Sequence, residues 1–222
     1  MRYRYVTFDC YGTLVDWRKG IESGLHAALG DLRLSGQDLL DAYVQAERNE
    51  EADYKRYREV LRLTVISMSG VLGVKVSDKA ARRFSESVPD WPPFEDTAEF
   101  LRLAGRRGYK RYILSNVDDD ILEETIKKHG LELDGFVTAQ EVGSYKPNPG
   151  QWLEFMQRTG AKKADVLHVA QSVYHDIIPC QRMGIDSAWI NRYNERMPPG
   201  PHPTYIADSL AHLAELLDAQ TP

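Results

Sequence analysis

Residues 4 to 16 read Arg4-Tyr-Val-Thr-Phe-Asp9-Cys-Tyr-Gly-Thr-Leu-Val-Asp16. The apolar run that ends at Phe8 is short and carries β-branched and aromatic side chains, which favours a buried strand. Gly12 allows a tight turn directly beneath Asp9. The segment therefore predicts a strand that ends in a carboxylate.

Strand and helix patterns alternate through the second half of the chain. Strands are expected at 109–114, 136–138, 166–170 and 187–191, and helices at 97–107, 118–129, 148–159, 176–183 and 209–219. Strands separated by helices imply right-handed crossovers. We therefore predict an α/β fold with a doubly wound parallel sheet.

The block between these two parts has a helical pattern throughout. No proline occurs before Pro89, so long helices are allowed, and apolar side chains recur at helical spacing around Leu39 and Val60. We expect residues 16–89 to form a helical cap, inserted into a core made of residues 1–15 and 90–222.

Composition excludes several classes of protein. The 222 residues have a net charge of −5 and no basic run, which argues against nucleic acid as the partner. No apolar stretch reaches the roughly 20 residues that cross a bilayer, and the first residues lack a signal-peptide pattern. The only two cysteines, Cys10 and Cys180, are expected in the core rather than in a disulfide. We expect a cytoplasmic protein that binds neither membrane nor nucleic acid.

Reactive side chains follow the predicted strands. Because working residues of parallel sheets lie at the carboxyl ends of strands, one edge should gather a carboxylate, a hydroxyl–amide pair, an ammonium and a second carboxylate. These are Asp9, Ser115-Asn116, the Lys146 loop, and the segment 172–176 that ends at Asp176.

These segments, in this order, resemble the four motifs of the haloacid dehalogenase superfamily of hydrolases. The resemblance spans about residues 5–217. It rests on Phe8-Asp-Cys-Tyr-Gly-Thr-Leu-Val-Asp16, Ile113-Leu-Ser-Asn116, Tyr145-Lys-Pro147, residues 172–176, and the late run Met183-Gly-Ile-Asp-Ser-Ala-Trp-Ile-Asn-Arg192.

The resemblance implies covalent catalysis. Asp9 would attack the substrate, Lys146 would keep Asp9 ionised, and Ser115 and Thr13 would donate hydrogen bonds to the nucleophile or to a bound anion. Asp176 would activate or position the water that hydrolyses the intermediate.

Two positions favour the 2-haloacid dehalogenase branch (type II, L-specific) over the phosphatases. Phosphatases of the superfamily carry an acid two residues after the nucleophile, where this chain has Tyr11, and an acidic metal ligand where it has Ser172. An alkoxide needs a proton to leave, whereas a halide does not. The resemblance thus implies halide displacement from a small 2-halo carboxylate, through an aspartyl ester, to a 2-hydroxy acid, with no metal or other cofactor.

Substrate contacts are implied for Tyr11, Asn116 and Ser172, and for Trp152, which stands where this branch has a tyrosine. Arg48 is the cap residue expected to handle the substrate carboxylate or halide, although a solvated charge on an acidic helix face is the alternative interpretation. The branch has an asparagine at Val173 and a serine at Gln171, and both differences bear on the substrate.

Three alternatives remain open. The chain could be a phosphatase with Mg²⁺ held by Asp9, the Tyr11 backbone and Asp176, or a weakly catalytic binding protein. A homodimer is the third alternative, because this branch is often dimeric.

His175 is interpreted either as a pocket residue or as a helix-start residue, and His168 as a satisfied buried histidine. The acidic run 118–120 is read as the start of a helix, where acidic side chains complement the dipole.

Overall fold

The computed structural model describes residues 2–219 and has a six-stranded parallel sheet at its centre. The strands lie in the order β3-β2-β1-β4-β5-β6. Their bounds are β1 Tyr5–Phe8, β2 Lys110–Ser115, β3 Gly135–Thr138, β4 Val166–Ala170, β5 Asp186–Ile190 and β6 Tyr205–Ala207. The predicted α/β fold with a doubly wound parallel sheet is confirmed.

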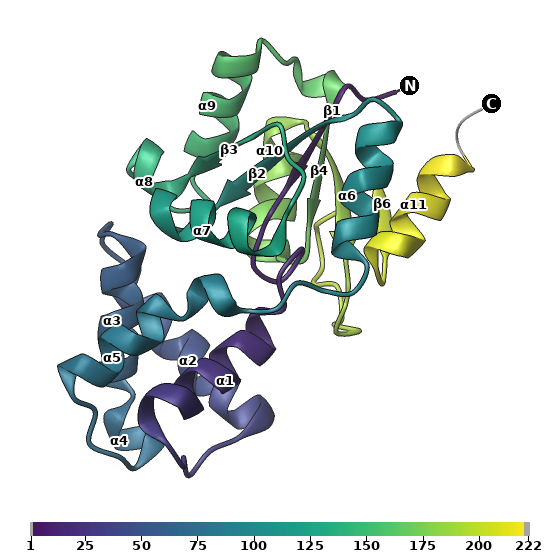
Figure 1. The fold of residues 1–222 in the computed structure, drawn as a ribbon. Helices are drawn as coiled ribbons and strands as arrows, with labels where there is room; N and C mark the ends of the chain where they lie inside the picture. Colours follow the sequence, from purple (N-terminus) through teal and green to yellow (C-terminus); the bar gives the residue numbers. More distant parts are fainter. Residues whose placement is uncertain (1, 220–222) are drawn as a thin grey trace.

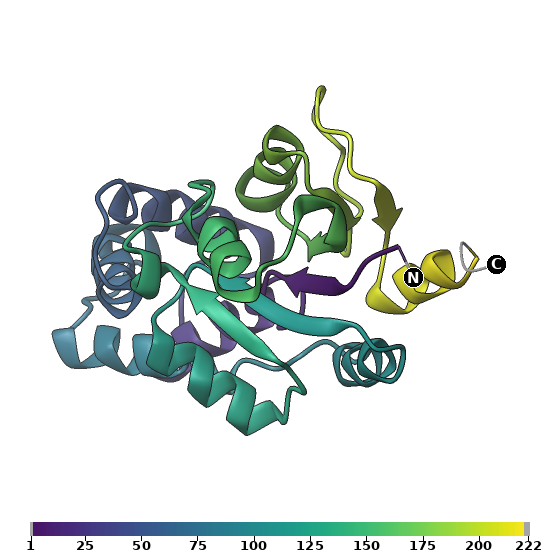
Figure 2. The same ribbon diagram turned by 90° about the horizontal axis from the view of Figure 1, so that it is seen from above.

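Helices cover both faces of this sheet (Figure 2). One face carries α6 (Thr97–Arg106), α7 (Asp119–His129) and α11 (Leu210–Asp218), and the other carries α9 (Gly150–Thr159) and α10 (Ile178–Met183). Short segments complete the core: α8 (Ala139–Val142), η1 (Val88–Asp90), η2 (Lys163–Asp165) and the π-helical turn η3 (Val173–Ile177).

Five helices fall within the residues expected to form the cap. They are α1 (Trp17–Leu29), α2 (Gly36–Glu50), α3 (Tyr57–Ser67), α4 (Ser69–Leu72) and α5 (Asp78–Glu86). The chain enters this group directly after β1, and Figure 1 shows it as a separate bundle beyond the sheet. We refer to these helices as the cap.

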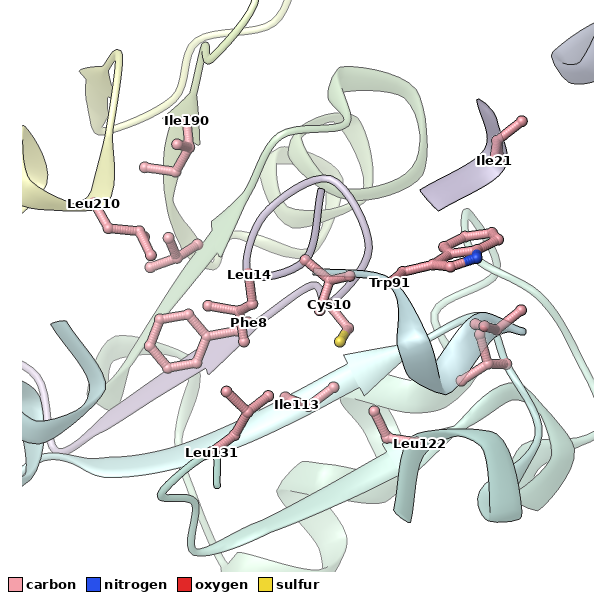
Figure 3. Packing of buried hydrophobic residues seen from close by; sticks show 14 of the residues in the cluster. Phe8, Cys10, Leu14, Ile21, Trp91, Ile113, Leu122, Leu131, Ile190 and Leu210 are labelled. Carbon is pink, nitrogen blue, oxygen red and sulfur yellow. The ribbon is translucent and has the colours of Figure 1, made fainter. Parts of the chain in front are cut away.

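Alternating side chains of the strands divide the apolar core between the two faces. Phe8 and Ile113 pack towards α6, α7 and α11, whereas Tyr5 and Leu114 pack towards α9 and α10. The larger cluster continues from Phe8 and Leu14 to Trp91 and Ile21 at the root of the cap (Figure 3). Cys10 and Cys180 are both buried and unpaired, as expected.

Three local predictions differ from the structure. The strand β6 was not predicted, because three residues next to the proline-rich segment 198–203 carry too little pattern. The helix expected at 176–183 is preceded by the turn η3 and begins at Ile178. The helix expected from residue 148 begins at Gly150, since Pro147 and Pro149 restrict the preceding backbone. Within residues 2–219, no helix is long and apolar enough to cross a membrane.

Candidate active site

The carboxyl ends of the central strands bring the predicted reactive side chains together. Phe8, the last residue of β1, lies opposite Ile113 in β2 and Val169 in β4, so the segments that follow these strands start side by side. A single pocket is lined by Asp9, Ser115, Asn116, Lys146 and Asp176. The sheet register thus assembles residues that lie far apart in the sequence.

Lys146 joins the two carboxylates. Its Nζ donates hydrogen bonds to Asp9 Oδ1 at 2.8 Å, to Asp176 Oδ1 at 2.7 Å and to the Leu114 carbonyl at 2.9 Å. All three N–H groups of the ammonium are therefore used, and its position between the carboxylates is fixed.

Thr13 holds the other oxygen of the nucleophile candidate. Its hydroxyl donates to Asp9 Oδ2 at 3.1 Å and accepts from the Gln171 N–H at 2.9 Å. The turn that brings Thr13 back to Asp9 passes through Gly12 at φ +106°, where a side chain would be strained and would lie 3.0 Å from Trp17 Cδ1. The local sequence Asp-x-x-Gly-Thr is thus what gives Asp9 its second hydrogen bond.

Burial and charge act in opposite directions on these groups. Burial raises the pKa of Asp9, and Lys146 is the largest opposing influence. Burial likewise acts to raise the pKa of Asp176, but Lys146 and His168 outweigh it and lower that pKa to about 2. Asp176 is therefore ionised near pH 7, and both carboxylates keep the pKa of Lys146 above its usual value despite burial.

Asn116 positions the lysine loop. Its Oδ1 accepts from the Lys146 N–H at 2.7 Å and from Gln151 Nε2 at 2.9 Å, and its Nδ2 donates to the Lys146 carbonyl at 3.1 Å. The peptide bond between Lys146 and Pro147 is cis. Asn116 lines the pocket as expected, and its side-chain amide, bonded to the protein at both ends, also positions the lysine loop.

The pocket lies between the strand ends and the cap and has a volume of about 490 Å³. Its lining is made of core residues on one side and residues of α1 and α2 on the other. The cap side includes Trp17, Ile21, Leu40, Val44, Glu47 and Arg48. A cavity of this size suits a small molecule.

Ser115 and Arg48 are potential ligand-binding groups in the pocket. The buried hydroxyl of Ser115 makes no hydrogen bond with any described residue. The guanidinium of Arg48, on α2, likewise has neither a hydrogen bond nor an ion pair within residues 2–219. Ser115 supplies a hydroxyl and Arg48 a positive charge, so both can bind an anion.

Tyr11 lines the pocket with its ring, but its hydroxyl points elsewhere. The hydroxyl lies 2.8 Å from Thr125 Oγ1 on α7, and the ring packs edge-on against Trp91. Burial raises the pKa of Tyr11 well above its usual value. Tyr11 therefore lines the pocket while its hydroxyl is bonded to Thr125, and the raised pKa makes that hydroxyl a weak acid.

Trp152 is not a pocket residue, and the expectation that it contacts substrate is wrong. Its side chain is 0% exposed and packs in the core beneath α9, with its ring centroid 5.2 Å from that of His168. The helix turns this position towards the sheet rather than towards the strand ends.

His168 contacts the site in a way that the sequence did not predict. It is fully buried, its Nε2 lies 3.0 Å from Asp176 Oδ1, and its Nδ1 lies 2.8 Å from the Thr7 hydroxyl, the residue opposite it in β1. It is a satisfied buried histidine, as expected, but it also orients a site carboxylate. The only sequence signal is a polar residue within an otherwise apolar strand.

Ser172 and His175 both line the pocket, and they are bonded to each other. Ser172 Oγ accepts from the His175 backbone N–H at 3.1 Å and lies 3.0 Å from His175 Nδ1. Burial lowers the pKa of His175 to about 4, so its imidazole is neutral near pH 7. Of its two interpretations, pocket residue and helix start, the structure supports the first.

Two cap glutamates in the pocket were also missed. Glu47 Oε1 accepts hydrogen bonds from the hydroxyls of Tyr43 at 3.1 Å and Tyr57 at 2.7 Å. Burial and the neighbouring Glu47 raise the pKa of Glu51 to about 8. Glu51 is thus largely protonated near pH 7, which limits the negative charge on this side of the pocket. In the sequence, these acids look like part of the ordinary solvent-exposed face of a helix, so they gave no signal of a site.

A Mg²⁺ site at the strand ends would need several hard oxygen ligands. Asp9 and Asp176 are both bonded to the Lys146 ammonium, and Ser172 stands where the phosphatases place a further acid. No group of three metal-ligating side chains occurs within residues 2–219. We therefore derive no step that uses a metal.

Comparisons with known proteins point to one family. A family model described as haloacid dehalogenase-like hydrolase matches residues 3–184. The (S)-2-haloacid dehalogenase of Pseudomonas fluorescens is 25% identical over 219 residues, which cover 95% of this chain and 94% of that protein. The pyrimidine 5'-nucleotidase YjjG of Escherichia coli is 28% identical over 120 residues, 53% of each chain.

Solved structures show the same fold. The L-2-haloacid dehalogenase from Xanthobacter autotrophicus, with chloropropionic acid covalently bound, superposes with a TM-score of 0.85 and 19% identity. The match covers 99% of this chain and 100% of that one.

Proposed function

We propose that this chain, which belongs to the family of haloacid dehalogenase-like hydrolases, displaces halide from a small 2-halo carboxylic acid and releases a 2-hydroxy acid. The observation that carries the proposal is the environment of Asp9. Lys146 and Thr13 hold its two oxygens, while the side chain two residues on, Tyr11, has its hydroxyl against Thr125 and offers no proton to a leaving group. Halide leaves without one.

The first step is a substitution at C2 of the substrate. An oxygen of the Asp9 carboxylate forms a bond to C2, and the C2–halogen bond breaks as halide departs with the electron pair. Lys146 and Thr13 stabilise the charged carboxylate against the effect of burial and fix its direction of attack. The product is an ester between Asp9 and the substrate.

Anion-binding groups of the pocket would orient the substrate carboxylate. Arg48 supplies a positive charge from the cap that makes no hydrogen bond or close ion pair within residues 2–219, and Ser115 supplies a hydroxyl without a protein partner from the end of β2. Protonation of Glu51 reduces repulsion of a negatively charged substrate.

The second step is hydrolysis of the ester. Water adds to Cγ of Asp9, the bond from Cγ to the substrate oxygen breaks, and the 2-hydroxy acid leaves. In this scheme Asp176 keeps Lys146 in place beside Asp9, with His168 behind it.

A single-turnover reaction in ¹⁸O water tests the proposal. Excess protein is mixed with racemic 2-chloropropionate, with and without Mg²⁺, and free chloride and the mass of the Asp9 peptide are followed. We expect chloride release without metal and ¹⁸O in Asp9, both abolished by Asp9→Asn. Absence of chloride release from the parent protein would refute the proposal for short haloacids.

Arg48→Gln tests the carboxylate contact. We expect KM for the haloacid to rise about tenfold with little change in kcat, since uniform binding is lost. An unchanged KM would contradict the carboxylate contact and support the alternative interpretation, in which Arg48 is a solvated charge on the helix surface.

Phosphoester hydrolysis is the second candidate, because a nucleotidase is among the relatives. The same preparation is therefore assayed with a nucleoside monophosphate and Mg²⁺. Turnover there, with no chloride release from haloacids, would favour the phosphatase over the dehalogenase.

A further inference from the structure

His175 is a neutral imidazole at the pocket wall to which the two steps above give no role. It lies in the π-helical turn η3, between the end of β4 and α10. Ser172, the residue that begins this turn, contacts both the His175 backbone N–H and Nδ1, at 3.1 and 3.0 Å. The ring is thereby fixed from one side.

The other ring nitrogen is available to a ligand. Within residues 2–219, His175 Nε2 makes no hydrogen bond, and the residue lines the same pocket as Asp9 and Lys146. When Nδ1–H donates to Ser172 Oγ, the free lone pair of the ring is on Nε2. This is the form that accepts a proton.

The other titratable groups close to Asp9 are weak bases. Asp176 Oδ1 already accepts from Lys146 and His168, and its second oxygen is buried without a protein partner. Two cationic or N–H donors on one carboxylate stabilise its charged form and weaken it as a base. Lys146 is itself charged and has used all three N–H groups.

We propose that His175 is the general base, and then the general acid, in hydrolysis of the ester on Asp9. The inference rests on the proposed function, since it concerns the second step of that reaction. Ser172 is the residue that holds the orientation of the ring.

Hydrolysis of the ester through His175 consumes one water. Water loses a proton to His175 Nε2 while its oxygen bonds to Cγ of Asp9. The tetrahedral intermediate then collapses, the bond from Cγ to the substrate oxygen breaks, and the leaving alkoxide takes the proton from Nε2. Asp9 is regenerated as a carboxylic acid that loses its proton to solvent, so the ester and one water give the 2-hydroxy acid and the free enzyme.

The test separates the two steps in His175→Gln and His175→Asn. Single-turnover chloride release should stay near the parent rate, which also shows that the variant is folded. Release of the hydroxy acid should slow by about 100-fold or more, as expected for loss of a general base. The ester should then accumulate on the Asp9 peptide and be seen by mass spectrometry.

Controls distinguish this role from a structural one. His202→Gln, on an exposed loop, should match the parent in both steps. Ser172→Ala should slow only the second step, and by less. Added imidazole should speed ester hydrolysis in His175→Ala.

Three outcomes would overturn the inference. The first is fast hydroxy-acid release in both His175 variants with no ester detected. The second is an equal slowing of chloride and hydroxy-acid release, which indicates general damage. The third is ester accumulation in Asp176→Asn but in neither His175 variant, which assigns the base to Asp176. A parent protein that releases no chloride would instead refute the proposed function, and the inference with it.

Discussion

Replacing Asp118 with asparagine should loosen the cap from the sheet. Asp118 follows β2 in the core, yet its Oδ1 and Oδ2 accept from the backbone N–H groups of Tyr57 and Arg58, each at 3.0 Å. These are the first two residues of α3, so a carboxylate of the core binds the N-terminus of a helix in the cap. The side chain is 1% exposed, which makes water a poor substitute.

The expected magnitude follows from these contacts. Asparagine keeps one acceptor oxygen, presents an NH₂ group to the other amide and removes the negative charge from the helix N-terminus. An N-cap substitution costs about 0.5–2 kcal/mol, and leaving a buried N–H unpaired costs about 1–3 kcal/mol. We expect a loss of about 2 kcal/mol, equivalent to about 30-fold more frequent opening of this contact.

Amide hydrogen exchange measures that opening directly. The Tyr57 and Arg58 amides should exchange about 30-fold faster in Asp118→Asn, while amides of β1 and β4 stay protected. Asp120→Asn is the matched control, because Asp120 reaches the same helix through Arg58 Nε at 2.9 Å but is half exposed. An exposed ion pair contributes under about 1 kcal/mol. Equal protection of the two amides in the Asp118 and Asp120 variants would refute the reasoning.

Three further predictions concern the site and the base of the cap. Because burial lowers the folded pKa of His175 to about 4 from 6.5, its contribution to stability is full above about pH 6.5 and is lost as pH falls towards 4. The loss should be about 2 kcal/mol near pH 5 and absent in His175→Gln, measured by urea midpoints; parallel midpoints in both proteins would contradict this. Trp152→Ala should lower the free energy of unfolding by about 3–5 kcal/mol, seen in urea denaturation, and leave KM of the folded fraction unchanged. A raised KM would indicate that Trp152 contributes to substrate binding after all. Gly20→Ala should lower the free energy of unfolding by about 1–3 kcal/mol, because its Cβ would lie 2.2 Å from Trp91 Cγ. Thermal unfolding measures this, and an unchanged Tm would show that the packing between α1 and Trp91 can rearrange without cost.

The sequence by itself determined five of the six strands of the sheet and the residues at its edge. An apolar strand followed by Asp9 and a tight glycine turn is a local pattern, and local patterns need only neighbouring residues. Parallel pairing then places all strand ends at one edge, so Lys146 and Asp176 could be expected beside Asp9 without any coordinates.

Only the tertiary structure decided where several side chains point and what they bind. The Tyr11 hydroxyl meets a threonine 114 residues away. Asp118 begins its own helix as expected, but its side chain accepts from the first amides of a helix about 60 residues earlier. Trp152 is buried rather than at the pocket, and His168 is bonded to a site carboxylate. Such contacts depend on how helices and strands pack against one another, and the spacing of residues along the chain does not indicate that packing.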